Sequence, residues 1–186
     1  MNFTKSILIA LASFVALPAY SATVSLVPST TTVSEGGSFT VDLVLDAADA
    51  PGNHPGSFRG LIELDYGSSA DYTGFTYTSP AVAFGATTDN PGVIELGFDL
   101  ANDVGVIGTF SFDVTGSAGD VIDLDLEDAV FVIGSFFNTD PSPTKFTPTF
   151  VDAQVSVVPV PAAIWLLGSA LVGLGSMRRR KPLGNT

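Results

Sequence analysis

Cysteine is absent from this chain of 186 residues, and histidine occurs once. Without cysteine there can be no disulfide framework, no thiolate-bound metal or cluster and no thiol nucleophile. The single histidine, His54, lies among proline, glycine and asparagine residues, a composition typical of an exposed turn. The chain also lacks the nucleophile elbow of serine hydrolases, a phosphate-binding glycine loop and a zinc-protease helix motif. We therefore expect a protein that is not an enzyme.

Basic residues are scarce between the two ends of the chain. Of the seven, Lys5 lies near the start and residues 178–181 form one cluster near the end. The stretch between them holds only Arg59 and Lys145 against all nineteen acidic residues, a net charge of −17. Such an anionic domain repels phosphate backbones and anionic membrane surfaces, which excludes a nucleic-acid-binding role.

Residues 1–21 have the layout of a secretory signal peptide. Lys5 precedes an apolar run at 7–17, which is followed by Pro18 and by small residues. Ala19 and Ser21 favour cleavage after Ser21, with cleavage after Ala22 as the alternative. An uncleaved anchor is the competing interpretation, but the run is too short to cross a hydrocarbon core of about 30 Å. We therefore predict an exported protein.

An apolar stretch at residues 157–177 precedes the basic cluster, and a short tail, 182–186, follows it. Its 162–177 portion predicts a single transmembrane helix, at the short limit for spanning because it rises only about 1.5 Å per residue. The basic cluster would stay cytoplasmic, which places the preceding domain on the far side of the inner membrane. A buried amphipathic helix is the alternative, but the segment contains no charged residue and so has no polar face.

The order of these C-terminal pieces resembles the PEP-CTERM sorting signal of Gram-negative bacteria, in the variant that begins Val-Pro-x-Pro-Ala-Ala. The residues that carry the resemblance are Val158, Pro159, Val160, Pro161, Ala162, Ala163, Trp165, Arg178, Arg179, Arg180 and Lys181. Val160 replaces the glutamate of the name-giving motif. Over residues 157–181 the resemblance implies processing by an exosortase-type membrane enzyme. It also implies delivery of the mature domain to the cell surface or the extracellular matrix.

Residues 22–156 alternate between apolar and polar side chains with a period of two, the pattern of half-buried antiparallel strands. The alternation is clearest at residues 39–46, 62–65, 94–99, 110–114, 122–127 and 153–157. Clusters of glycine, proline, asparagine and aspartate separate these segments, and no segment shows a helical period. We therefore predict an all-β domain of eight or nine short strands, an antiparallel, jelly-roll-like β-sandwich.

The strand order of this domain resembles that of cohesins and the related carbohydrate-binding superfamily. Residues 34–41 are similar to their entry strand with a G-x-x-F-x-V pattern, and residues 58–66 to an element that ends in Leu-x-Tyr-Asp, although no aspartate follows Tyr66. Residues 107–112 and 119–124 look like two later strands of the family, and residues 152–157 complete the set. The resemblance implies a recognition module and brings no catalytic residue with it.

Three tyrosines in a stretch rich in glycine, serine and threonine are candidate ligand contacts: Tyr66, Tyr72 and Tyr77. Flat aromatic faces with polar rims suit sugar rings. Packing in the core is the alternative, favoured because Phe75 and Tyr77 share one strand face.

No cofactor is expected, and calcium is the metal that an exported acidic domain would meet. Asp99, Asn102 and Asp103 form the best-shaped loop for it, although the signal is weak. The residues Asp123, Asp125 and Glu127 share one strand face, but residues two apart on a strand are about 6.6 Å apart, too far to cage one ion. We interpret that face as a solvated one that guards a sheet edge against aggregation.

The sequence thus predicts an exported, non-enzymatic surface or extracellular-matrix protein with a structural or adhesive role. The alternative is a cohesin-like module that recognises an exopolysaccharide or a partner protein. A hydrolase with paired carboxylates is a third hypothesis, but most of the carboxylates lie at outward or turn positions. Arg59 is expected to pair with a neighbouring carboxylate.

Overall fold

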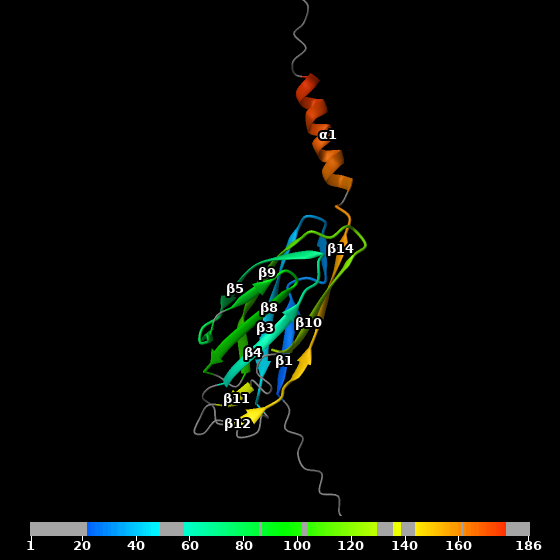
Figure 1. Ribbon diagram of the computed structural model, residues 1–186. Helices are drawn as coiled ribbons and strands as arrows, with labels where there is room; N and C mark the ends of the chain where they lie inside the picture. Colours follow the sequence, from blue (N-terminus) through cyan, green and yellow to red (C-terminus); the bar gives the residue numbers. More distant parts are fainter. Residues whose placement is uncertain are drawn as a thin grey trace, which may run out of the picture.

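Two β-sheets packed face to face make up the body of the protein, with a helix beyond one end (Figure 1). The computed structural model describes residues 22–48, 58–85, 87–101, 104–129, 136–138, 144–160 and 162–177. The predicted signal peptide, His54 and the basic cluster at 178–181 lie outside these residues.

Fourteen strands and one helix occur in the described residues, and eight of the strands have six or more residues. The long strands are β1 (Thr23–Pro28), β3 (Ser38–Asp46), β4 (Phe58–Asp65), β5 (Ala70–Tyr77), β8 (Val93–Leu100), β9 (Val104–Val114), β10 (Val121–Asp128) and β14 (Ala153–Val158). The short ones are β2 (Thr32–Ser34), β6 (Val82–Ala83), β7 (Thr88–Asn90), β11 (Phe136–Asn138), β12 (Thr144–Phe146) and β13 (Thr149–Val151). The prediction of eight or nine strands is therefore too low, because six segments of two or three residues also form strands.

One sheet has the order β13-β1-β3-β9-β5, and in the other β4 lies between β8 on one side and β10 and β11 on the other. β14 and β2 continue that second sheet beyond β10, while β6 and β7 pair with the outer side of β8. The prediction of an antiparallel sandwich is correct for the long neighbours but incomplete. Two end pairings, β1 with β13 and β14 with β2, are parallel, because short segments far apart in the chain run along the sheet edges.

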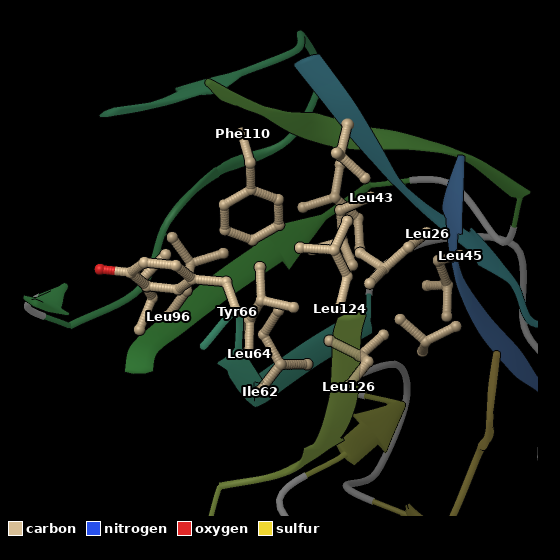
Figure 2. Close-up of a cluster of buried hydrophobic side chains, with 14 of the residues drawn as sticks. Leu26, Leu43, Leu45, Ile62, Leu64, Tyr66, Leu96, Phe110, Leu124 and Leu126 are labelled. Atoms are coloured by element: carbon tan, nitrogen blue, oxygen red, sulfur yellow. The ribbon is translucent and has the colours of Figure 1, made fainter. Parts of the chain in front are cut away.

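The predicted alternation places the apolar residues between the sheets. In β3, Phe39, Val41, Leu43 and Leu45 are at most 3% exposed, whereas Thr40 and Asp46 face outward. Leucines from both sheets interdigitate in the centre of the core (Figure 2). Fully burying one such side chain stabilises the fold by roughly 1.5–3 kcal/mol, so the core can hold the domain together without disulfides.

The sandwich ends at Val158, two residues beyond the predicted domain end, because β14 continues to that residue and the Glu35 amide donates to the Val158 carbonyl at 3.1 Å. The helix α1 (Ala162–Met177) covers the predicted helical residues. Leu166 and Val172 on it are 69% and 74% exposed. Within the described part of the chain, no helix has both the length and the apolar character needed to cross a membrane. The membrane-spanning role of this segment stays a prediction.

Gly60 in β4 gives a direct test of the packing on the buried face of the second sheet. A Cβ atom there would lie 2.6 Å from ring atoms of both Phe98 and Phe136, so we expect Gly60→Ala to destabilise the protein by about 1–3 kcal/mol in urea unfolding. Gly105→Ala in β9 is the matched control, because a Cβ there meets nothing within 4 Å. Equal stabilities of the two variants would contradict this packing.

Candidate functional site

The outer surface of the second sheet carries two rows of carboxylates across neighbouring strands. Glu127 of β10 lies opposite Glu63 of β4, and Glu63 lies opposite Glu95 of β8. In the next row Asp125 of β10 lies opposite Asp65 of β4. The residues between them on each strand are buried in the core, which directs these side chains outward. We call these five residues the carboxylate rows.

Directly opposed like charges destabilise a sheet, typically by about 0.2–1 kcal/mol for each pair. At Asp125, which is exposed, slight desolvation raises the pKa most, and the nearby carboxylates of Asp152, Asp123 and Asp65 raise it further. The interpretation of this strand face as guarding a sheet edge was wrong. β10 is an interior strand, paired with β4 on one side and β14 on the other. Protection of a sheet edge therefore does not explain the carboxylate rows.

Arg59 lies at the far end of this surface and forms the predicted pair with a carboxylate. Its Nε and Nη2 atoms donate to the two carboxylate oxygens of Asp99 at 2.6 and 2.9 Å. The hydrogen bond with Asp99 raises the pKa of Arg59. The guanidinium carbon also lies 3.8 Å from the centre of the Phe84 ring. This bidentate, stacked arrangement fixes Arg59 on the surface.

The same contact bears on the calcium candidates. Asp99 is engaged with Arg59, and Asn102 and Asp103 lie outside the described residues. Among the residues that the structure describes, no group of three or more acidic or histidine side chains is arranged to hold a metal ion. Calcium binding is therefore left as a prediction without structural support.

The three candidate tyrosines separate into two environments. Tyr66 and Tyr72 line a hollow of about 430 Å³ at the edge of the sandwich, together with Asp71, Asp89 and Pro91. Tyr77 does not line it, because its hydroxyl donates to the Gly97 carbonyl at 2.7 Å. The core-packing interpretation is partly correct, since the Tyr66 ring lies 5.4 Å from that of Phe112. We call the hollow the tyrosine cleft.

The electrostatics of the cleft are set by its acidic lining. Burial raises the pKa of Tyr72, and the negative charge of Asp89 raises it further, so its phenol stays protonated at neutral pH. Asp71 on β5 lies opposite Asp113 on β9, which lines the hollow on the outer surface of the first sheet and not the cleft. Sequence analysis selected the two tyrosines but missed Asp89 and Pro91, which come from a different strand and turn.

The sorting residues fall at the end of the described sandwich. Val158 ends β14, Pro159 and Val160 follow it without regular structure, and Ala162, Ala163 and Trp165 lie in α1. Pro161 and the four residues Arg178, Arg179, Arg180 and Lys181 lie outside the described residues.

Comparison with solved structures identifies the fold. A type I cohesin of ScaB from Pseudobacteroides cellulosolvens matches with a TM-score of 0.59 at 16% identity, over 76% of this chain and 94% of the cohesin. A non-cellulosomal cohesin from the archaeon Archaeoglobus fulgidus matches with a TM-score of 0.54 at 13% identity, over 78% and 97%. The fold is cohesin-like.

A third similar structure comes from a type I cohesin–dockerin complex of Clostridium thermocellum. Its TM-score is 0.52 at 12% identity, over 73% of this chain and 99% of that chain. No protein-family model matches the sequence, and no curated protein matches it either. The predicted cohesin-like sandwich is thus confirmed at the level of the fold.

Replacement of Asp125 tests the repulsion within the rows. Because its pKa is raised in the folded state, protonation of this carboxyl stabilises the fold. That contribution is complete below the unfolded-state pKa and is lost as the pH rises through the folded-state pKa. We expect Asp125→Asn to raise the free energy of unfolding at pH 7 by about 0.2–1 kcal/mol.

The gain from Asp125→Asn should shrink in high salt and disappear as the pH falls below the normal aspartate range. Urea unfolding of Glu35→Gln, which removes an exposed carboxylate in a turn, is the control and should show no gain. A destabilised Asp125→Asn protein at pH 7 would contradict the proposed repulsion.

Proposed function

We propose that this protein is a non-enzymatic recognition module that binds a partner protein through the outer surface of β10, β4 and β8. The cohesin-like sandwich is the observation that carries the proposal. It extends over almost the whole length of the similar cohesins, several of which are described in complex with a dockerin. The identity of the partner here is defined by chemistry, as a protein with a basic surface.

The carboxylate rows support the choice of surface. They concentrate negative charge on a flat sheet, where it raises the association rate of a cationic partner. Lysine or arginine side chains set between the rows would also relieve the cross-strand repulsion, so binding and stabilisation would reinforce each other. Leu61 on β4 adds a half-buried apolar side chain beside the row of glutamates.

The surface of the other sheet differs in chemistry. A shallow hollow there is lined by Ser29, Ser38, Thr40, Thr73 and Ser111, among others. Asp113 is the one charged residue among those that line it, so the hollow holds less negative charge than the carboxylate rows, and its hydroxyl groups support the alternative of an adhesive or polysaccharide contact. The experiment must therefore distinguish the two surfaces.

The double variant Glu95→Gln/Glu127→Gln removes two charges from one row. We expect it to weaken the binding of a partner captured from the producing cells by about tenfold, mostly through faster dissociation and a lower sensitivity to salt. Surface plasmon resonance with the immobilised protein, in 50 and 300 mM salt, would measure both.

The charge-matched control is Glu35→Gln/Asp46→Asn, which removes two carboxylates outside the surface. It should bind like the unmodified protein. Equal weakening in both double variants would show a non-specific charge effect, and an unchanged affinity in the first variant would contradict the proposed surface. Retention of polysaccharide instead of protein would favour the adhesive alternative.

We also infer that the domain is exported and sorted to the cell envelope or extracellular matrix by its C-terminal segment. The support is the signal-peptide layout, the PEP-CTERM-like tail and the exposed apolar side chains of α1. An exosortase-type enzyme is the expected processing partner, and the segment after Val158 is available for cleavage because the sandwich is complete there.

Deletion of residues 159–186 tests the sorting role without touching β14. We expect the shortened protein to fold normally, as judged by its melting temperature, but to leave the envelope fraction for the periplasm or the medium. Cell fractionation would measure this, with the full-length chain as the reference. An unchanged distribution would contradict a sorting role for the tail.

A further inference from the structure

The tyrosine cleft is a second place where the protein can hold a ligand, separate from the carboxylate rows. Tyr66 directly follows β4 and is buried. Its amide donates to the Gly92 carbonyl at 2.8 Å. This bond holds the turn between β7 and β8 against the end of β4, which brings Asp89 and Pro91 beside Tyr66. Asp71 and Tyr72 come from β5 in the other sheet. The cleft is thus built from both sheets.

The hydroxyl group of Tyr66 gives the cleft its specific character. Tyr66 is only 5% exposed, and within the described residues its hydroxyl has no hydrogen-bond partner. Figure 2 shows the hydroxyl oxygen directed away from the centre of the leucine cluster, toward the edge of the sandwich. Buried phenol groups normally find a partner, so a buried hydroxyl that ends in a hollow indicates a missing one.

An inventory of donors and acceptors defines the missing ligand. The lining side chains offer two carboxylates and two phenol oxygens as acceptors, and only the two phenol hydroxyls as donors. A lysine ammonium group has three donors and no acceptor, which complements this lining. The guanidinium group of arginine is a wide planar fork suited to a single carboxylate.

The negative charges of the lining residues also favour an ammonium group. A neutral sugar that covered Asp71 and Asp89 would remove water from both carboxylates without compensating their charge. An ammonium group compensates it, and its aliphatic stem can pack along the Tyr72 ring, which is half-buried and lies 6.1 Å from the ring of Phe112. The volume of about 430 Å³ falls in the range of small-ligand sites, roughly 300–1,000 Å³.

We propose that the tyrosine cleft binds the side chain of a lysine from a protein partner, with its ammonium group held by Asp89 and the Tyr66 hydroxyl and with Asp71 adding negative charge at the rim of the cleft. The proposal does not depend on the carboxylate rows, because none of their residues lines the cleft. Either site can therefore fail without the other.

Binding of the peptide acetyl-Gly-Lys-Gly-amide to the full-length protein tests the proposal. NMR spectra of the tyrosine rings would report binding at the cleft, and the matched peptides carry acetyl-lysine or arginine in place of lysine. We expect the lysine peptide to shift the Tyr66 and Tyr72 signals in a saturable way, and the acetyl-lysine peptide to have no effect. The arginine peptide should bind at least threefold more weakly.

Two variants identify the contacts. Tyr66→Phe removes only the hydroxyl and should weaken lysine binding roughly fivefold, while Asp89→Asn should weaken it about tenfold or more. Glu35→Gln, which removes an exposed carboxylate from a turn and does not line the cleft, is the control and should bind within twofold of the unmodified protein. Melting temperatures check that each variant is folded.

Each of the following results would overturn the proposal. Absence of saturable shifts with the lysine peptide, or equal binding of lysine and acetyl-lysine peptides, would exclude an ammonium site. Saturable binding of a neutral disaccharide such as cellobiose, lost in both Tyr66→Phe and Asp89→Asn, would assign the cleft to sugars instead.

Discussion

Burial of every second side chain between the two sheets is the interaction on which the rest of this structure depends. With no cysteine available, the domain relies on apolar contacts such as the stacked rings of Phe39 and Phe112, whose centres lie 5.2 Å apart. A shift of one residue in any strand pairing would turn its buried side chains toward the solvent, so this core also fixes the register of both sheets. The register in turn determines which side chains are neighbours on the outer surface of each sheet.

The carboxylate rows are a direct consequence. Once Leu64, Leu126 and Ile94 face the core at matching positions, the acidic residues next to them must line up on the outside. Each opposed pair destabilises the sheet by a fraction of a kilocalorie per mole, whereas each large buried side chain stabilises it by roughly 1.5–3 kcal/mol. The core therefore tolerates a concentration of like charge that a less well-packed sheet could not hold.

The sequence was sufficient to predict the fold because period-two alternation is a local signal. The same locality explains what could not be predicted. Glu63 and Glu95 are neighbours only through the pairing of β4 with β8, and β10 is an interior strand only because β14 returns to its far side. The environments of Tyr66 and Tyr77 differ for the same reason. Tyr66 lines an open hollow, whereas the Tyr77 hydroxyl donates to the Gly97 carbonyl. Cross-strand neighbours depend on register, which composition does not reveal.

The two sites differ in that only the tyrosine cleft contains a buried polar group, the Tyr66 hydroxyl, and this difference suggests that they act at different stages of binding. The carboxylate rows are largely exposed, so their attraction extends over the surrounding solution but is weakened beyond about 8 Å at physiological ionic strength. In the tyrosine cleft the carboxylates of Asp71 and Asp89 are exposed as well, but the Tyr66 hydroxyl is buried, so the geometry of hydrogen bonding around it matters more. A lysine-bearing partner would thus be attracted first by the rows and then distinguished from other cationic proteins by the fit of one ammonium group. The exposed charges of the rows would set the rate at which the partner is encountered, whereas the buried hydroxyl of Tyr66 would set the selectivity of binding.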